Sequence, residues 1–185
     1  MENILNNRID AIKLLEGKED LIKKIDIFSK EIFNTLAANK KIIFCGNGGS
    51  FSQASHMSAE LSGRFLKERN SQKSIVLGAN LSSLTSIGND YSYEEIFSRE
   101  LEGIGESGDL LIAYSTSGNS SNITNVLKKA RNMNIKSILF SGNDGGEGKQ
   151  YCNFDFIVPE NHTPIIQEIH LIVGHIILEI VDYKI

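Results

Sequence analysis

The chain has 185 residues, of which 19 are Lys or Arg and 23 are Asp or Glu, so its formal net charge is −4 at pH 7. This length favours a single domain with a sizeable core, and the lack of a basic excess argues against a primary role in nucleic-acid binding. The two cysteines, Cys45 and Cys152, form no C-x-x-C pair and do not indicate a disulfide framework, and Cys45 is expected to be a small core residue.

Two amphipathic helices are predicted ahead of the first strand, over residues 3–16 and about 19–38, with Gly17 as the stop of the first. They carry no obvious chemistry and are expected to form a cover or an oligomer contact. The N-terminal residues are polar and acidic, unlike the basic start and apolar run of a signal peptide. We therefore expect a cytoplasmic protein.

From residue 41 onward, short apolar runs alternate with helical patterns. Strands are predicted at residues 41–45, 74–78, 109–114, 136–141 and 154–158. Helices are predicted at about residues 50–66, 80–87, 92–103, 119–133, 145–151 and 163–183. Five apolar strands separated by helices indicate a parallel sheet with helices on both faces. The most apolar stretch, residues 171–181, is interrupted by Gly174, His175 and Glu179. It is too short to span a bilayer, so no membrane association is expected.

The first predicted strand runs into the glycine-rich turn GNGGS (residues 46–50), and a helix follows. A helix start carries unpaired N–H groups and the positive end of the helix dipole, so it suits a bound anion. Glycines let the backbone turn sharply and approach a ligand closely. His56 and Glu60 follow at a spacing of i, i+4, which places them on one face of the same helix. One element is therefore predicted to carry both an anion seat and an ionisable pair.

A second candidate loop follows the third strand, at the sheet edge where ligands bind in open parallel sheets. Its sequence, STSGNS (residues 115–120), offers four hydroxyls and a glycine but no lysine. Such a loop suits a phosphate monoester, although it also suits an ordinary Ser/Thr N-cap. A dinucleotide fingerprint needs a glycine where Phe51 stands, and neither loop has the Gly-Lys-Ser/Thr of a Walker A motif. The predicted ligand is a phosphorylated small molecule.

The ionisable residues of the candidate site fall on two helices. His56, Glu60 and Arg64 share one face of the first, and Gln167 and His175 lie about 80° apart around the last, so both can face one site. A His-x3-Glu pair is also compatible with an ordinary surface. His175 interrupts an apolar run and is either buried and satisfied or a functional group that emerges from the core.

Taken together, four segments resemble the phosphoheptose isomerases, a branch of the sugar isomerase (SIS) domain superfamily. They are GNGGS-x5-H-x3-EL-x-GR (residues 46–64), GND (88–90), STSGNS (115–120) and QEIH-x4-H (167–175). The resemblance spans essentially the whole chain and implies a single SIS domain over residues 1–185. In this reading, N-terminal helices over residues 1–39 precede a flavodoxin-like, three-layer αβα sandwich with a five-stranded parallel sheet over residues 40–185.

That family interconverts sedoheptulose 7-phosphate and D-glycero-D-manno-heptose 7-phosphate, the first step toward nucleotide-activated heptose for surface polysaccharides. By this resemblance, the phosphate-binding residues are Ser50, Ser115, Thr116, Ser117 and Ser120. The sugar is expected to contact Asn47, Asp90 and Gln167, with Gly48, Gly49, Glu60, Arg64 and Asn89 completing the substrate-binding set. The resemblance also implies one Zn²⁺ per subunit, held by His56, Glu60, Gln167 and His175. It further implies a homotetramer with its sites between subunits.

The chemistry of an aldose–ketose interchange gives two of these residues distinct roles. The reaction needs a base near the carbons, an acid near the oxygens and stabilisation of an enediolate. A partly buried carboxylate suits the first role, so Glu60 is assigned to take the C1 proton of the ketose and deliver it to C2. Imidazole exchanges protons near neutrality, so His175 is assigned to O1 and O2. Coordination to zinc would occupy lone pairs that both residues need, which leaves the ion as an activator, a loosely held Lewis acid or a structural ion.

Two departures from the family pattern lie near the site. Gln53 stands where Asp is usual, and Pro164 and Ile165 replace a polar-or-Ala, Arg pair. Both lie where substrate choice could be tuned, so an isomerase of a different phosphosugar is one alternative. A sugar-phosphate-sensing module is another, and a third is a non-catalytic SIS-domain protein that binds a replication initiator. Relatives of that last kind lack counterparts of Glu60 and His175, whereas this chain has both.

Overall fold

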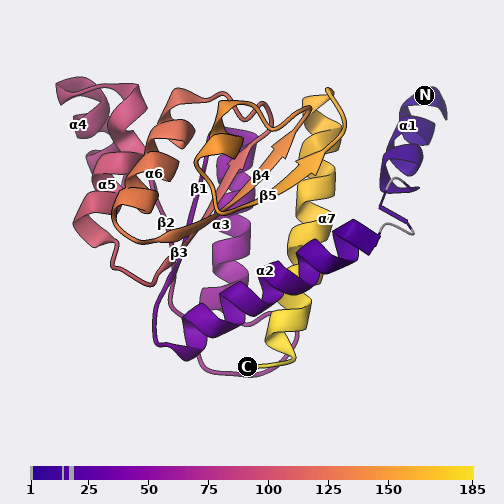
Figure 1. The fold of residues 1–185 in the computed structure, drawn as a ribbon, viewed down its shortest axis with the longest axis horizontal. Coiled ribbons are helices and arrows are strands. Elements are labelled where there is room, and N and C mark those ends of the chain that lie inside the picture. Colours follow the sequence, from indigo (N-terminus) through magenta and orange to yellow (C-terminus); the bar gives the residue numbers. More distant parts are fainter. Residues whose placement is uncertain (1, 14, 17–18) are drawn as a thin grey trace.

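A parallel five-stranded sheet organises the chain in the computed structural model, which describes residues 2–13, 15–16 and 19–185 (Figure 1). Its strands are β1 (Ile42–Gly46), β2 (Ser74–Val76), β3 (Leu110–Ser115), β4 (Lys136–Gly142) and β5 (Phe154–Val158). The helices are α1 (Glu2–Lys13), α2 (Glu19–Ala37), α3 (Gly49–Ser62), α4 (Leu81–Asp90), α5 (Ile96–Ile104), α6 (Ser121–Asn132) and α7 (Thr163–Asp182). Two short 3₁₀ turns, η1 (Tyr93–Glu95) and η2 (Glu147–Gln150), complete the described elements.

The strands lie in the order β2-β1-β3-β4-β5, and every neighbouring pair is parallel. All residues of β1 and β3 are buried, which explains why these strands are continuous apolar runs rather than alternating ones. The chain order changes direction between β1 and β3, the switch point at which flavodoxin-like sheets bind ligands. The predicted flavodoxin-like parallel sheet is therefore confirmed.

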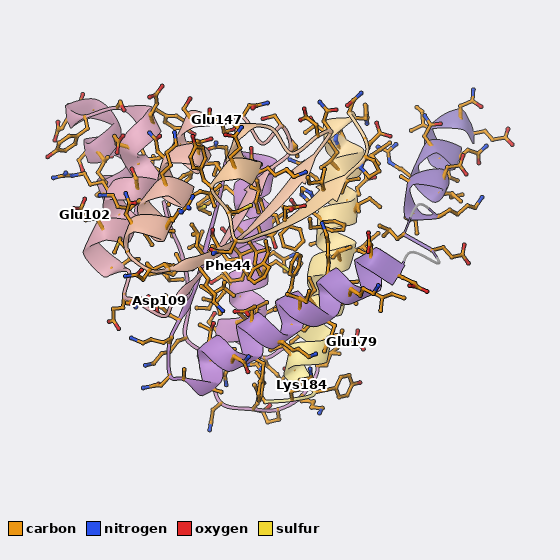
Figure 2. The ribbon with its side chains drawn as sticks, in the orientation of Figure 1. Phe44, Glu102, Asp109, Glu147, Glu179 and Lys184 are labelled. Carbon is orange, nitrogen blue, oxygen red and sulfur yellow. The ribbon has the colours of Figure 1, made fainter. Side chains whose placement is uncertain are left out.

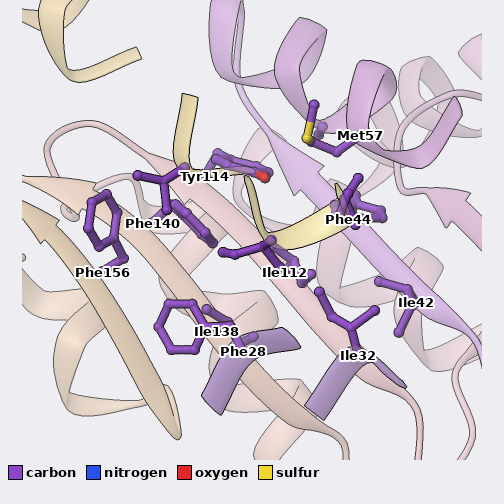
Figure 3. Close-up of a cluster of buried hydrophobic side chains, with 14 of the residues drawn as sticks. Phe28, Ile32, Ile42, Phe44, Met57, Ile112, Tyr114, Ile138, Phe140 and Phe156 are labelled. Atoms are coloured by element: carbon purple, nitrogen blue, oxygen red, sulfur yellow. The ribbon is translucent and has the colours of Figure 1, made fainter. Parts of the chain in front are cut away.

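Helices cover both faces of the sheet and enclose two apolar clusters. On one face, α2, α3 and α7 pack against the sheet through the cluster shown in Figure 3, whose members include Phe28, Ile32, Phe44, Met57, Ile112, Tyr114 and Phe140. On the other face, α4, α5 and α6 cover a cluster that includes Ile43, Cys45, Phe97, Leu101 and Val126. Cys45 is fully buried, as predicted, and burial raises the pKa of its thiol well above the usual range.

The last helix, α7, is longer than the apolar run that predicted it. It spans 20 residues, and its most apolar 18-residue window has a mean hydropathy of 1.6, so by length and composition it could cross a membrane. The predicted stretch, residues 171–181, is only part of this helix, so its shortness does not by itself decide whether the helix could span a membrane. Ile169, Val173 and Val181 are at most 1% exposed within the fold, where α7 packs on α2 and α3. Its apolar composition thus matches its place in the core.

Several predicted boundaries need correction. α3 ends at Ser62 instead of residue 66, because Gly63 caps it by donating its N–H to the Ala59 carbonyl at 2.8 Å. The helix predicted at 145–151 is only the turn η2, in a segment where Gly145 and Gly146 both have positive φ. The predicted stop Gly17 lies outside the described residues. Helix α1 projects from the body of the fold (Figure 1) and exposes four apolar side chains, those of Ile4, Leu5, Ile9 and Ile12.

Candidate active site

The GNGGS turn joins β1 to α3 and requires glycine at two positions. A Cβ on Gly46 would lie 2.6 Å from the carbonyl carbon of Ser50, so the backbone of the turn closes tightly over itself. Gly48 has φ +54°, a conformation that L side chains rarely adopt. Ser50 is buried in the first turn of α3, and its N–H donates to the Asn47 carbonyl at 3.0 Å. The turn therefore presents the amino end of a 14-residue helix at the carboxyl edge of the sheet.

Near the other end of α3, three ionisable side chains converge. His56 Nε2 lies 2.9 Å from Glu60 Oε1, and the His56 and His175 rings have their centroids 5.0 Å apart. One ligand atom from each of the three residues falls within 4.8 Å of the others. The Glu60 side chain is 20% exposed and that of His56 is 46% exposed, so the cluster opens to solvent on the His56 side. His175 is thus a functional candidate that emerges between α3 and α7, as one of the two sequence readings proposed.

The Phe65 ring stacks on one face of the His175 imidazole. The two rings are stacked, with centroids 5.9 Å apart and planes inclined by 17°. Phe65 lies just past the end of α3, in a segment that the sequence predicted as helix. Because α3 ends at Ser62 with its cap at Gly63, Phe65 belongs to the irregular segment that follows and stacks on His175 of α7 from there.

The GNGGS turn lies at the start of α3, whereas His56 lies in its middle and Glu60 in its last turn. Glu60 follows Gly49 by eleven residues, which is roughly 16 Å of helix rise. The GNGGS turn and the His56–Glu60 pair thus belong to one helix, as predicted, and the anion-binding role of the turn stays a prediction.

Gln167 lies beside the anion seat in this chain. A Cβ built on Gly49 would come within 2.7 Å of Gln167 Nε2, so only glycine leaves room for this amide. Gln167 precedes His175 by eight residues on α7, about 12 Å along the axis. The structure therefore brings together three of the four predicted zinc ligands, and Gln167 stays a prediction.

Gln53, the first departure from the family pattern, is buried behind Gln167. Its Nε2 donates to the Gln167 carbonyl, while its Oε1 is buried and has no hydrogen-bond partner in the described part of the chain. This side chain therefore ties α3 to α7 through the backbone of a predicted substrate-binding residue. No hydrogen bond among the described residues joins it to His56, Glu60 or His175.

The predicted phosphate loop, STSGNS, is a closed structure that packs on the loop after β4. Ser115 Oγ and Ser120 Oγ lie 3.4 Å apart, and Ser117 Oγ accepts the Asn119 N–H at 3.1 Å. Gly118 has φ +65°, and a Cβ there would lie 2.0 Å from the carbonyl oxygen of Gly145. The glycine is therefore needed both for the turn and for the contact between the two loops.

Two residues near Asn47 were missed from the sequence. Asn47 and Asn122 exchange side-chain amide hydrogen bonds at 2.8 and 2.9 Å, which joins the GNGGS turn to the start of α6. The Tyr93 hydroxyl donates to Asn47 Oδ1 at 3.0 Å. The sequence offered one signal for Asn122, which lies two residues after STSGNS, in the predicted helix. A buried amide in the first turn of a helix needs hydrogen-bond partners, and the neighbouring loop is the place to look for them.

Three predicted substrate contacts do not reach these loops within one chain. Asn89 and Asp90 are the last residues of α4 rather than part of a loop, and Asn89 Nδ2 donates to Asp90 Oδ1 at 2.8 Å. Both are exposed, as is Arg64 beyond the end of α3. No hydrogen bond among the described residues joins any of the three to GNGGS or STSGNS, so their substrate roles stay predictions.

Residues 10–142 match the SIS domain family, and the doubly wound sheet with hydroxyl-rich loops at its carboxyl edge agrees with that match, so this is a SIS-domain protein. The chain is 43% identical to the phosphoheptose isomerase of Clostridium acetobutylicum, with 98% of this chain and 95% of that protein covered. The phosphoheptose isomerase of Aliarcobacter butzleri gives the same identity and the same coverage. The solved phosphoheptose isomerase from Neisseria gonorrhoeae superposes with a TM-score of 0.91 at 30% identity, covering 98% of this chain and 96% of that one. The chain therefore belongs to the phosphoheptose isomerase family.

Proposed function

We propose that the protein interconverts sedoheptulose 7-phosphate and D-glycero-D-manno-heptose 7-phosphate in the synthesis of nucleotide-activated heptose. The observation that carries the proposal is the convergence of Glu60 and His175, from α3 and α7, on one partly open cluster with His56. Membership of the phosphoheptose isomerase family supports the choice of a seven-carbon sugar phosphate. The presence of both Glu60 and His175 argues against a non-catalytic binding protein.

The proposed reaction moves two protons. Glu60 takes a proton from C1 of the ketose and returns it to C2, so the C1–H bond breaks and a C2–H bond forms. His175 accepts the proton of the O1 hydroxyl and donates a proton to O2, the former carbonyl oxygen, so no net charge is left on the product. Glu60 Oε1 already contacts His56 at 2.9 Å. In the described part of the chain its Oε2 has no hydrogen-bond partner, and this oxygen is the one we assign to the C1 proton.

Binding at the far end of the substrate is assigned to neutral groups. Hydroxyls of Ser50, Ser115, Thr116, Ser117 and Ser120, together with the amino ends of α3 and α6, would hold the phosphate by hydrogen bonds and helix dipoles. Asn47 and Gln167 lie at the same edge and suit the sugar hydroxyls. Binding there leaves the reacting carbons free to extend toward a Glu60–His175 pair.

The separation along α3 supports a site shared between copies of the chain. Because the anion seat lies about 16 Å of helix rise from Glu60, we propose that one subunit supplies the phosphate loop and another supplies the base. A homotetramer would provide such shared sites, and the exposed apolar face of α1 offers it a contact surface. We also propose that the protein acts in the cytoplasm, where its sugar phosphate substrate is made.

The three-residue cluster fits a zinc ion by the chemistry of its donors. Two imidazoles and a carboxylate, with ligand atoms within 4.8 Å of one another, are a donor set that Zn²⁺ prefers. We propose that His56, Glu60 and His175 hold the ion, with Gln167 as the predicted fourth ligand. When bound, zinc supplies positive charge that polarises a carbonyl and stabilises an enediolate.

Zinc binding is expected to be measurable without any assay of turnover. The metal-free protein should take up one Zn²⁺ per cluster in equilibrium dialysis. His56→Asn should weaken that binding by at least about 10-fold, because it removes one donor. His162→Asn changes an exposed histidine outside the cluster and serves as the control. Equal zinc affinity in the two variants would contradict the assignment.

Exchange with solvent tests the reaction itself. Incubated in D₂O with the folded, zinc-supplied protein, sedoheptulose 7-phosphate should gain one deuterium at C1, because the reverse reaction returns a solvent-derived proton to that carbon. Mass spectrometry of the recovered ketose measures this gain. A panel of ketose phosphates of other lengths, assayed alongside, tests whether Gln53, Pro164 and Ile165 direct the protein to a different phosphosugar. Absence of exchange with every ketose would favour a binding protein.

A further inference from the structure

An almost fully buried ion pair ties the segment after α3 to the end of α7. Arg69 Nε donates to Asp182 Oδ1 at 2.6 Å, and the two side chains are 7% and 2% exposed. Asp182 lies between Glu179 and Lys184, which Figure 2 labels at the carboxyl end of α7. Its second oxygen accepts the backbone N–H groups of Leu66 and Lys67 at 3.2 and 3.0 Å. One carboxylate therefore fixes the path of the chain from α3 toward β2.

The same guanidinium caps α3 at the residue that carries the proposed base. Arg69 Nη2 donates to the Glu60 carbonyl at 2.6 Å, and Nη1 donates to the Leu61 carbonyl at 2.9 Å. The last carbonyls of a helix have no partner within it, and a cation there also interacts favourably with the negative end of the helix dipole. Arg69 supplies both the hydrogen bonds and the charge.

The electrostatics keep Asp182 ionised in this position. Burial alone would raise the pKa of its carboxyl, but the hydrogen bonds from Arg69 and from the Lys67 and Leu66 amides hold it below the usual range. Asp182 accepts from three donors, one of which is the Arg69 guanidinium, and a buried carboxylate that loses its cationic partner is strongly destabilising. The pair therefore acts as one unit.

We infer that Arg69 and Asp182 are positioning residues, which set the separation between Glu60 on α3 and His175 on α7. Arg69 donates a hydrogen bond to the Glu60 carbonyl, and Asp182 follows His175 by about two turns of α7. Asp182 also accepts the backbone amides of Leu66 and Lys67, which directly follow Phe65 in the chain. The ion pair therefore fixes the segment from which Phe65 stacks on the His175 imidazole. The role in turnover rests on the proposed function, whereas the effect on the geometry of the cluster does not.

Asp182→Asn is the first test, with Asp109→Asn as a matched control. Asp109 is also buried, accepts two backbone amides, from Lys41 and Glu106, and pairs with Lys41 Nζ at 2.8 Å. It lies just before β3, where Figure 2 labels it, and its hydrogen bonds run to Lys41 and Glu106, which are in neither α3 nor α7. Asp182→Asn should lower kcat by about 10- to 30-fold with KM within about threefold, because a small misplacement of the base costs turnover more than binding. Asp109→Asn should leave kcat unchanged at a temperature where both variants are folded.

A second variant and a spectroscopic readout complete the test. Arg69→Lys keeps the charge, but one ammonium cannot reproduce the fork that spans Asp182 and two α3 carbonyls, so it should lower kcat in the same range. In both Arg69→Lys and Asp182→Asn, the NMR signals of the His175 ring protons should lose the ring-current shift imposed by Phe65, whereas Asp109→Asn should retain it. Variants at Arg69 and Asp182 that match Asp109→Asn in both readouts would overturn the inference. A wild-type protein without turnover would instead refute the proposed function, and the NMR comparison would still decide the positioning role.

Discussion

Replacing Glu60 with Gln is expected to lower kcat by about 10³-fold, within the range that loss of a general base produces. The amide is nearly isosteric with the carboxylate and can keep a hydrogen bond to His56, so the cluster should persist. It cannot accept the C1 proton, because the amide is far less basic than a carboxylate. KM should change only a few-fold, since the residues assigned to the phosphate lie in STSGNS and at the amino end of α3, and Glu60 is in neither segment.

Steady-state kinetics and solvent deuterium exchange at C1 together measure this loss. Both should fall in parallel, because the same proton transfer limits both. Glu179→Gln provides the control, as it makes the same chemical change at an exposed position of α7. Zinc content should be measured in each variant, so that loss of the metal can be told apart from loss of the base. Residual turnover above about a tenth of wild type would mean that another group takes the proton.

The sheet could be predicted because its strands are buried on both faces. A segment such as β1 has no polar face, so its apolar run stands out between helical patterns. The strand order came with the family resemblance rather than from the runs themselves, since apolarity alone says nothing about which strand lies beside which. Helix ends were less accurate wherever a glycine decided them, as at Gly63.

The candidate site was predicted in its residue types but only partly in its geometry. A spacing of i, i+4 correctly placed His56 beside Glu60, because helix periodicity is local. The convergence of His175 on them depends on how α7 crosses α3, and no local pattern encodes that. Arg69 and Asp182 were missed for the same reason, since 113 residues separate them in the chain. Their buried charge becomes visible only once the helices are packed.

Acidification is expected to destabilise the fold through His170, which the proposed reaction does not use. This histidine is fully buried, its Nε2–H donates to the Ser141 carbonyl at 3.0 Å, and its ring packs against Phe140 with centroids 5.6 Å apart. Burial lowers the pKa of His170 to about 4, although the bond to Ser141 opposes the shift. The neutral ring is therefore the form that the core accepts.

The direction of the effect follows from where each state binds the proton. Between an unfolded pKa of about 6.5 and the folded value of about 4, the unfolded chain is protonated at His170 while the folded chain is not. The free energy of unfolding should consequently fall as the pH is lowered through this window, by about 3 kcal/mol in all. Below about pH 4 both states carry the proton, so the His170 contribution to stability has been lost in full and no longer changes with pH. Above pH 6.5 it is fully present.

Urea denaturation at fixed protein concentration, followed from pH 7.5 to 4.5, measures this slope against that of His170→Gln. The Gln side chain keeps a donor for the Ser141 carbonyl but does not titrate, so its curve should stay flatter than that of the wild type. Carboxylates such as Asp182, whose pKa is lowered in the fold, contribute their own loss at more acidic pH and do so equally in both proteins. The difference between the two curves thus isolates His170. Parallel curves would contradict the prediction, because they would mean that the folded protein stabilises the protonated imidazole. His170 Nδ1, which would carry the added proton, is buried and has no hydrogen-bond acceptor in the described part of the chain, so such stabilisation is not expected.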